Sequence, residues 1–385
     1  MRAVGRAGLR GENFPLMFTA SRPVRVFVSE FVCGGGLEGS SLPDSLLREG
    51  RAMLWAVVDD LLQVAGCQVV TTLDRRLAHE AQDRRTSRCQ IAIVTSVDEE
   101  QRLFEESAAS SDAVLVIAPE TDGLLADRVR RVLTLGVTTL NCSPEAIELC
   151  GDKLQLARHC EDQGLATFPT QMVDWSSSPL PSVGSSEWVI KPRDGAGSWL
   201  MFRVRTGSLE DWQRAETAFA CSGIPGKALI QPFVRGWPLS VGCHCQPNGE
   251  IEIFPIGEQR LSKDFAYLGG SIPAALPLAT ETAVRDLVQR TCATISGLNG
   301  HIGFDLLLPE ADPTRPLLVE INPRLTTSYV GYRRLSKSNL AERWLRCAGL
   351  LSDSKPAPQP SSALKWPARR IDFDAHGHVR SSDVS

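Results

Sequence analysis

Two short apolar segments near the C-terminal end place the strongest constraint on the fold of this chain. Residues 303–308 (GFDLLL) and 317–324 (LLVEINPR) are separated by a polar link that contains prolines. Apolar runs of this length, bounded by turn residues, predict the two strands of a β-hairpin. If the chain reverses near Asp312, antiparallel pairing places Asp305 opposite Glu320.

This hairpin would bring three oxygen ligands together. Side chains alternate along a strand, so Glu320 and Asn322 share one face, next to Asp305 on the neighbouring strand. Mg²⁺ accepts such ligands when water and nucleotide phosphates complete its coordination. A single carboxylate is usually only exposed to solvent, but here Arg324 follows directly, and a guanidinium suits a phosphate oxygen held by the same ion. The sequence therefore predicts a metal and phosphate site.

A second segment, residues 188–198 (WVIKPRDGAGS), combines a strand-like run that ends in Lys191 with a glycine loop. Glycine permits positive φ and close approach, so the N–H groups of such a loop can surround phosphate oxygens while the lysine supplies a charge. The loop alone would most often be an ordinary turn, and it becomes informative only beside the metal hairpin. The chain contains no G-x-x-x-x-G-K-[ST] motif, which excludes a P-loop.

Four elements resemble, in their order and approximate spacing, the ATP-grasp ligases. Lys153 begins a helix, and Lys191 precedes the glycine loop. The segment 229–236 (LIQPFVRG) follows, and then comes the trio of metal ligands in the hairpin. The resemblance covers residues 153–324 and implies the corresponding fold.

The resemblance also implies which residues bind ATP and the metal. ATP would lie between two small α+β lobes, with Lys153 and Lys191 on its phosphates. Further nucleotide contacts would come from the glycine loop and from the segment between the lobes: Gly195, Gly197, Ser198, Gln231, Phe233 and Val234. The ion, Mg²⁺ or Mn²⁺, would take its ligands from the hairpin: Asp305, Glu320 and Asn322. Lys191 and Arg324 would act in catalysis. Gln231 stands where the family commonly has glutamate, which weakens the predicted adenine or ribose contact.

The chemistry that the resemblance implies is ATP-dependent ligation. A carboxylate attacks the γ-phosphate to make an acylphosphate, and an amine then displaces phosphate to leave an amide, ADP and phosphate. The demand on the protein is mainly electrostatic, because phosphoryl transfer spreads negative charge over several oxygens. A nucleotide-binding regulatory protein without turnover is an alternative, although the intact set of like-charged ligands argues against it.

Three further segments resemble one group within this family, the tyramine–L-glutamate ligases of methanofuran biosynthesis: 24–36, 42–54 and 320–332. The small-molecule substrates would then be L-glutamate and tyramine, and a ligase that joins other amino acids or amines is the alternative. Polar residues just past the metal strand are candidates for the acceptor pocket: Thr326, Thr327, Ser328, Tyr329 and Tyr332. Arg260 or Arg333 would bind the α-carboxylate of glutamate.

Gly34 to Gly39 matches the G-x-G-x-x-G pattern of dinucleotide-binding proteins. We interpret it differently, because the next helix begins only near Pro43, beyond the glycines, whereas the fingerprint needs the helix to start within the motif. The glycine turn is instead expected to let the backbone approach a small substrate. Glu30 and Glu49 are candidate partners for the amine of that substrate, or else ordinary solvated carboxylates.

Composition narrows the class of protein further. A formal net charge of −4 argues against a surface for nucleic acid or anionic membranes, and no apolar stretch is long enough to span a bilayer. Eleven cysteines without regular spacing fit reduced thiols and a cytoplasmic location. Residues 243–245 (CHC) suggest a metal site, but no second ligand pair follows, so a buried strand is the preferred interpretation. The number of subunits stays open, and a homodimer is one arrangement considered.

Alternating strand and helix signals predict a small parallel α/β domain of the pre-ATP-grasp type. Its strands are expected at 24–32, 67–73, 92–95, 113–117 and 138–141, with helices at 44–65 and 124–135. Ser143 and Pro144 then form a helix start, which marks a domain boundary. The expected organisation is an N-terminal extension (1–23, with Met17 as an alternative start), the α/β domain (24–142), the two-lobed ATP-grasp domain (143–349) and a C-terminal surface extension (350–385).

Overall fold

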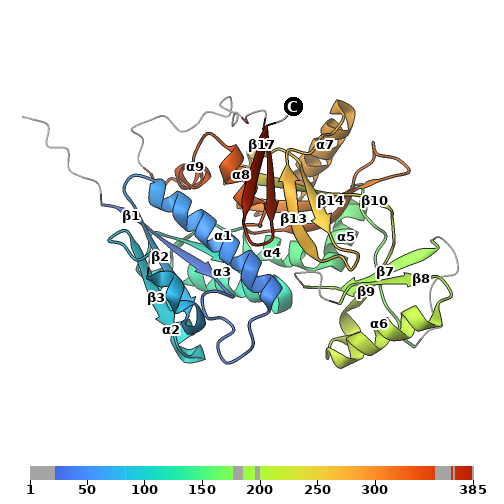
Figure 1. Cartoon of the computed structure of the whole chain (residues 1–385), viewed down its shortest axis with the longest axis horizontal. Helices are drawn as coiled ribbons and strands as arrows, with labels where there is room; N and C mark the ends of the chain where they lie inside the picture. The colour runs from blue at the N-terminus through green and yellow to red at the C-terminus, as the bar shows by residue number, and fades with distance from the viewer. Residues whose placement is uncertain are drawn as a thin grey trace, which may run out of the picture.

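The computed structural model describes residues 22–82, 84–176, 185–195, 200–351, 366 and 369–383. Figure 1 shows three bodies: an α/β layer structure at the N-terminal end, a small sheet with one covering helix, and a larger sheet between them. Within these described ranges, no helix has both the length and the apolar character needed to cross a membrane.

The N-terminal body is a five-stranded parallel sheet in the order β3-β2-β1-β4-β5. Its strands are β1 (Val24–Glu30), β2 (Cys67–Asp74), β3 (Cys89–Val94), β4 (Ala113–Ile117) and β5 (Thr138–Thr139). Its helices are α1 (Asp44–Gln63), α2 (Val97–Ala109) and α3 (Leu124–Thr134), with 3₁₀ turns at Arg75–Ala81 and Thr121–Gly123. The near-continuous burial of β1 and β4 is typical of a parallel sheet covered on both faces.

The predicted strands and two helices of this body are confirmed, apart from shifts at their ends. Helix α2 was not predicted, because its sequence is dominated by acidic residues around the buried Phe104. A local signal was present nonetheless. The hydroxyl of Ser96 accepts a hydrogen bond from the N–H of Glu99, and the Glu99 carboxylate accepts one from the N–H of Thr95, an arrangement close to a capping box.

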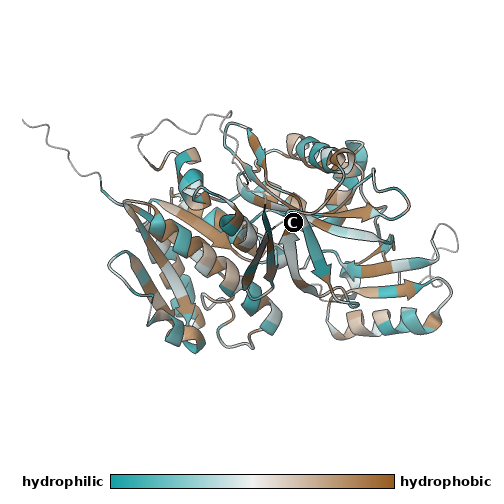
Figure 2. Cartoon of the chain, turned by 45° about the horizontal axis from the view of Figure 1, so that its top comes forward, coloured by the Kyte–Doolittle hydropathy of each residue, from teal (hydrophilic) through white to brown (hydrophobic). Residues whose placement is uncertain are grey.

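The small lobe is a four-stranded antiparallel sheet in the order β6-β9-β7-β8. It contains β6 (Gln171–Met172), β7 (Glu187–Pro192), β8 (Phe202–Arg205) and β9 (Ala228–Pro232), with a 3₁₀ turn at Pro225–Lys227. Helix α6 (Leu209–Cys221) covers one face and buries Trp212 and Phe219 against the sheet. In Figure 2, the strands and the helix of this lobe all carry both hydrophilic and hydrophobic residues, as expected for elements that bury one side.

The large lobe is an eight-stranded sheet in the order β15-β14-β10-β12-β13-β16-β17, with β11 paired to β10. Its strands are β10 (Gly236–Cys245), β11 (Ile251–Ile253), β12 (Gly257–Leu261), β13 (Tyr267–Ile272), β14 (Gly300–Pro309), β15 (Leu317–Asn322), β16 (Arg369–Asp374) and β17 (Val379–Asp383). The accompanying helices are α4 (Pro144–Gly151), α5 (Lys153–Asp162), α7 (Leu278–Thr294), α8 (Tyr329–Leu335) and α9 (Leu340–Cys347).

The hairpin predicted from the sequence is confirmed as β14 and β15. Asp305 pairs with Glu320, and Gly303 pairs with Asn322, in an antiparallel ladder with an irregularity just after Asp305. The pairing fixes which residues share a face, because a slip of one residue would turn every side chain over.

The C-terminal segment corrects the expectation of a surface extension. Residues 369–383 form a hairpin, β16–β17, that pairs with β13. Ile371 and Phe373 are only 1% and 2% exposed. The polar composition concealed this strand, because Phe373 packs against Gly270 and Gly331, two distant positions without a side chain.

One apolar core continues from the N-terminal body into the large lobe. It joins Leu54 and Leu61 of α1 to Tyr332 of α8 and Leu345 of α9. Buried apolar area is the main stabilising term in folding, so this shared core holds α1 against the large lobe. Residues of α1 can therefore contribute to a site in that lobe.

Candidate active site

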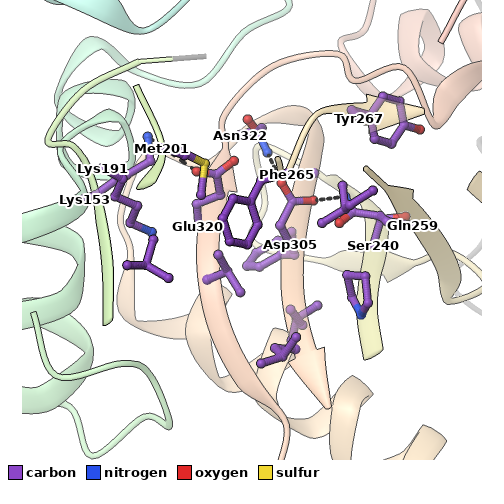
Figure 3. A pocket seen from close by; sticks show the side chains of 18 of the residues that line it. Lys153, Lys191, Met201, Ser240, Gln259, Phe265, Tyr267, Asp305, Glu320 and Asn322 are labelled. Atoms are coloured by element: carbon purple, nitrogen blue, oxygen red, sulfur yellow. Dashed lines mark hydrogen bonds and ion pairs between the residues drawn. The ribbon is translucent and has the colours of Figure 1, made fainter. Parts of the chain in front are cut away.

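A cavity of about 870 Å³ lies between the small and large lobes. Its wall is built from strands β7 and β9 of the small lobe and from β10, β12, β14 and β15 of the large lobe, together with the loop after β15 and one residue of α1. In Figure 3, Lys153 and Lys191 approach Glu320 from one side, and Asp305, Asn322 and Gln259 lie on the other.

Asp305 is held by three neighbours, two on the facing strand β15 and one on β12. Gln259 donates to its Oδ1 at 2.7 Å, Asn322 Nδ2 donates to its Oδ2 at 3.1 Å, and the Glu320 carboxyl is hydrogen-bonded to it. Burial, followed by the negative charge of Glu320, raises the pKa of Asp305. Two carboxyls in contact hold a proton that a divalent cation can replace.

The proposed ligands suit such a cation. Asp305 and Glu320 offer carboxylate oxygens, and Asn322 still has its amide oxygen because only its NH₂ group is engaged with Asp305. A set of oxygens alone fits Mg²⁺ or Mn²⁺. The three predicted ligands therefore lie together and have the right chemistry.

Two lysines flank this cluster. Lys153 Nζ lies 3.4 Å from Glu320 Oε2 and donates to the carbonyl of Gly195 at 3.0 Å. Lys191 is 4% exposed, and burial lowers its pKa to about 8. Burial alone would raise the pKa of Glu320, but the two lysines outweigh it and lower that pKa. The site therefore has alternating charges before any ligand binds.

The start of the glycine loop is fixed to helix α5. Asp152 caps the helix by accepting from the N–H groups of Leu154 and Gln155, and it receives two hydrogen bonds from Arg193, at 2.9 and 2.6 Å. The N–H of Lys153 in turn donates to the Arg193 carbonyl at 3.0 Å. Of the predicted loop contacts, Gly195 lines the cavity, whereas Gly197 and Ser198 lie outside the described residues.

The predicted adenine segment also lines the cavity. Gln231 is buried and its amide donates to Thr170 Oγ1 at 2.6 Å, so its side chain is engaged within the protein. The N–H of Phe233 donates to the carbonyl of Glu187 at 2.9 Å. Val234 and the ring of Phe233 face the cavity, and the Arg203 guanidinium lies 4.0 Å from the centre of that ring.

Arg324 lines the cavity but is already paired. Its Nε lies 2.9 Å from Glu120 Oε1, and both side chains are mostly buried. Burial alone would lower the pKa of Arg324, but Glu120, followed by Glu49 and Glu320, raises it. No local pattern predicted Glu120, which lies in a loop of the N-terminal body.

The prediction of the acceptor pocket is wrong for two of its five residues. Thr326, Thr327 and Ser328 line the cavity. Tyr329 and Tyr332 are fully buried and point elsewhere: the Tyr329 hydroxyl donates to Asp60, and the Tyr332 hydroxyl donates to the Pro255 carbonyl. They lie on helix α8, where successive residues face different directions.

Two pairs of residues were predicted to meet the charged groups of the substrates, and in each pair only one residue lines the cavity. Arg333 is committed to Asp60 in a buried ion pair at 2.5 Å, whereas Arg260 lines the cavity. Glu30 is buried, and its carboxylate accepts the N–H of Cys33, whereas Glu49 lines the cavity. One member of each predicted pair is therefore placed to meet a ligand.

The glycine turn after β1 is not part of the cavity wall. A side chain at Gly36 would collide with the Phe31 ring at 2.2 Å, and one at Gly35 would collide with Val94 at 2.6 Å. The glycines are thus explained by contacts with the protein itself, which corrects the expected approach to a substrate. Helix α1 begins only at Asp44, which supports the rejection of a dinucleotide fingerprint.

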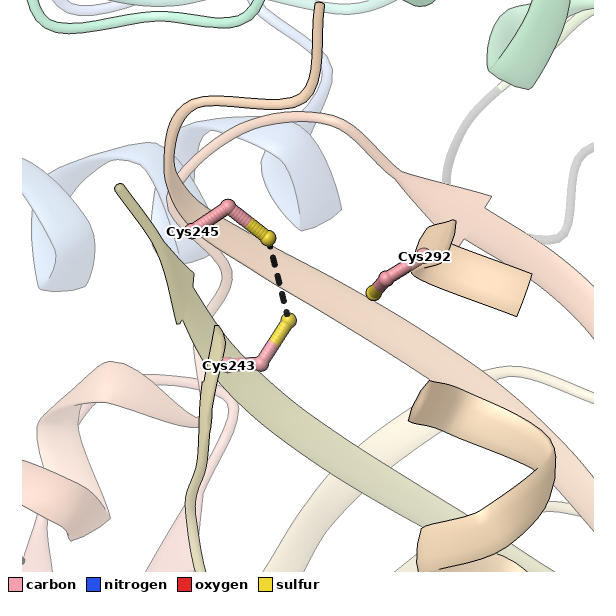
Figure 4. A group of neighbouring side chains, drawn as sticks. All are labelled: Cys243, Cys245 and Cys292. Atoms are coloured by element: carbon pink, nitrogen blue, oxygen red, sulfur yellow. Dashed lines mark hydrogen bonds between the residues drawn. The ribbon is translucent and has the colours of Figure 1, made fainter. Parts of the chain in front are cut away.

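The CHC segment lies in β10, as a buried strand, and has one partner that the sequence did not reveal. Cys243 and Cys245 place their sulfurs 4.0 Å apart, and Cys292 of α7 brings a third sulfur beside them (Figure 4). The three belong to the apolar core between the sheet and α7. Hydrogen bonds with Cys245 and Cys292, followed by burial, raise the pKa of Cys243.

Comparison with known proteins agrees with this architecture. A family model for the ATP-grasp domain matches residues 150–328, and one for the pre ATP-grasp 3 domain matches residues 67–147. The tyramine–L-glutamate ligase of Methanocaldococcus fervens is 25% identical over 321 residues, which cover 83% of this chain and 92% of the relative. The enzyme of the same name from Methanocaldococcus jannaschii is 23% identical over 323 residues, with 83% and 87% covered.

A solved structure shows the same fold. An ATP-grasp superfamily protein from Archaeoglobus fulgidus superposes with a TM-score of 0.64 at 22% identity, covering 91% of this chain and 92% of that protein. The chain therefore belongs to the ATP-grasp family of ligases, with a pre-ATP-grasp domain in front of its ATP-grasp domain.

Proposed function

We propose that this protein joins the carboxylate of L-glutamate to the amine of tyramine, with ATP as the energy source and ADP and phosphate as the other products. The observation that carries the ligase assignment is the facing pair of Asp305 and Glu320, flanked by Lys153 and Lys191 in one cavity. The choice of substrates rests on the relatives named tyramine–L-glutamate ligase.

Asp305, Glu320 and Asn322 would hold Mg²⁺ or Mn²⁺, which when bound neutralises charge on the transferring phosphate. Lys153 and Lys191 would bind the ATP phosphates, assisted by the loop that contains Gly195, Gly197 and Ser198. Adenine would lie against Gln231, Phe233 and Val234, where a ring and a backbone edge face the cavity. This assignment gives a role to the charged groups described above beside Glu320, which are Asp305, Lys153 and Lys191.

The reaction would proceed in two steps. The γ-carboxylate of glutamate attacks the γ-phosphorus of ATP, so ADP leaves and an acylphosphate forms. The acceptor ammonium first loses one proton to water; its nitrogen then attacks the acyl carbon, the bond from carbon to the bridging oxygen breaks, and phosphate leaves with its electrons and the second proton. Lys191 and Arg324 would stabilise the negative charge that develops in these steps.

Arg260 is the best-placed group for the α-carboxylate of glutamate. Its guanidinium is braced by the carbonyls of Gly270 at 3.2 Å and Phe373 at 2.6 Å and by the Ser271 hydroxyl at 3.0 Å, and it lies 3.7 Å from Asp372 Oδ1, a longer ion pair than the one that engages Arg333. A braced guanidinium can bind a carboxylate with little loss of conformational entropy. The C-terminal hairpin would thus support substrate binding through Phe373.

The test is to incubate the purified protein with Mg²⁺-ATP, glutamate and tyramine and to measure ADP and amide. The expected result is equal amounts of both, with either product suppressed when one substrate is omitted. Release of ADP with two amino acids, but not with glutamate and tyramine, would support a ligase with other substrates. No release of ADP with any carboxylate and amine would favour a regulatory nucleotide-binding protein.

A further inference from the structure

One carboxylate in the cavity is not used by the metal or the nucleotide. Glu49 lies on α1, in the N-terminal body, and is half-buried at the cavity wall. Thr327 Oγ1 donates to its Oε2 at 3.4 Å. The shared core between α1 and the large lobe holds this helix in place, so Glu49 reaches the cavity from a rigid element.

The charge of Glu49 is not cancelled by a close partner. Among the described lysines and arginines, none forms an ion pair with it, and the cation that most affects it, Arg324, is committed to Glu120 at 2.9 Å. Burial raises the pKa of Glu49, although Arg324 and Thr327 counter this. A carboxylate removed from water without a close counter-charge favours a cationic ligand.

The neighbouring acid does not compete for that ligand. Glu30 lies directly behind Gly50, where an added side chain would meet its Oε1 at 2.6 Å, and its carboxylate is turned toward the N–H of Cys33. Glu49 is thus the carboxylate of the N-terminal body that the cavity wall includes.

Glu49 and Arg260 are held by different elements. Glu49 contacts Thr327 in the loop that follows β15, whereas Arg260 contacts Gly270 on β13 and Phe373 on β16. The α-ammonium of glutamate is on the same carbon as its α-carboxylate, so it must lie near the group that binds that carboxylate. With Arg260 assigned to glutamate, Glu49 is available for the positive charge of the second substrate.

We propose that Glu49 binds the ammonium group of the acceptor amine, so that the acceptor is a primary ammonium compound held at the end of the cavity formed by α1 and residues 326–328. Tyr267 also lines the cavity, and burial, followed by the charges of Glu49 and Asp305, raises its pKa, whereas Arg260 opposes this, so all three charged groups lie within reach of its side chain. That ring offers an apolar wall for the aromatic part of the acceptor. This inference rests on the proposed ligase function.

The test separates activation of glutamate from capture of the acceptor. Hydroxylamine is a small amine that is largely uncharged at neutral pH, so it can trap the acylphosphate as a hydroxamate without needing an ammonium site. In Glu49→Gln, which keeps the shape of the side chain, hydroxamate formation from glutamate and Mg²⁺-ATP should stay within about twofold of the parent. The KM for tyramine should rise by about tenfold or more, because a charge-assisted hydrogen bond is lost.

Two further variants complete the experiment. Glu49→Asp keeps the charge and should recover part of the affinity for tyramine. Asp59→Asn removes a carboxylate from the same helix, where Asp59 pairs with Arg84 at 2.8 Å outside the cavity wall, and should match the parent in both assays.

The results that would contradict the role of Glu49 differ from the result that would contradict the proposed function. An unchanged KM for tyramine in Glu49→Gln would overturn the role of Glu49, and so would an equal loss of hydroxamate and amide formation, which would assign Glu49 to glutamate. If the parent forms neither hydroxamate nor ADP with glutamate, the proposed function fails and this inference fails with it.

Discussion

Glu320 lies at the centre of the candidate site, next to a second carboxylate and two lysines. It contacts the second carboxylate, Asp305, and lies 3.4 Å from Lys153. These contacts are electrostatic, so the side chain serves the charge balance of the site. Its neighbours in the strand, Leu318 and Ile321, are buried in the core and hold the backbone in place.

The first prediction concerns the charge of this residue. Glu320→Gln keeps the size of the side chain and removes the negative charge, so ATP turnover should fall at least about a hundredfold, as expected when a metal ligand is lost. The measurement is ADP release under saturating substrates, with the melting temperature as a check of folding. Glu310→Gln, at an exposed position just after β14, is the control and should keep full activity. Turnover within threefold of the parent would contradict the metal assignment.

At the scale of elements, strands β10 and β14 of the large lobe are joined by an antiparallel ladder of ten residue pairs. His244 and His301 are directly paired in this ladder, and both are buried. Burial lowers the pKa of His244 to about 4 and that of His301 to about 3, from 6.5. Both rings are therefore neutral members of the core at neutral pH, packed against aromatic neighbours such as Trp344 and Phe254.

The second prediction follows from these two histidines. Since their pKa values are lower in the folded state, the unfolded state binds more protons below pH 6.5, and the free energy of unfolding falls as the pH falls. From pH 7 to pH 5 the loss should be about 1–2 kcal/mol for each histidine. Urea unfolding at the two pH values measures it.

The controls for this prediction are two substitutions. His244→Phe keeps the ring contact with Trp344, 5.9 Å between centres, and should remove about half of the dependence on pH, because His301 remains. His378→Gln, at a position with 79% of the side chain exposed, should leave it unchanged. A dependence that is as steep in His244→Phe as in the parent would assign the effect to other groups.

At the scale of the whole molecule, the N-terminal body and the large lobe are joined by a polar network as well as by the apolar core. Asp60 of α1 accepts from the Tyr329 hydroxyl at 2.7 Å and from Arg333 of α8 at 2.5 Å. Asp60 is 5% exposed. The network fixes the position of α1, and therefore of Glu49, relative to the large lobe that contains β14 and β15.

The third prediction tests this connection. Asp60→Ala leaves Arg333 buried without its carboxylate, so the free energy of unfolding should fall by about 3–5 kcal/mol. Calorimetry or urea unfolding measures the loss, and Asp59→Asn on the same helix should cost less than about 1 kcal/mol because its ion pair is exposed. A loss below about 1 kcal/mol in Asp60→Ala would show that the apolar core alone holds the two bodies together.

Local patterns in the sequence determined the hairpin β14–β15 and the positions of the parallel strands along the chain. The register of Asp305 and Glu320 followed from period-two alternation and one turn, and the parallel strands followed from apolar runs between helices. These features depend on residues close together in the chain, where side-chain periodicity and turn chemistry act directly.

Only the tertiary structure decided which other residues join the site. Gln259 and Glu120 come from separate segments, and no local pattern distinguishes them from exposed polar residues. Glu30 and Glu49 were both candidates, and the structure decided that Glu49 is the one that lines the cavity. The direction of Tyr329 and the burial of Phe373 likewise depend on distant partners, since a side chain points into a core or a cavity according to which elements pack around it. The sequence therefore specified the hairpin strands, whereas the packing of α1 against the large lobe and of the two lobes around the cavity determined which other residues line it.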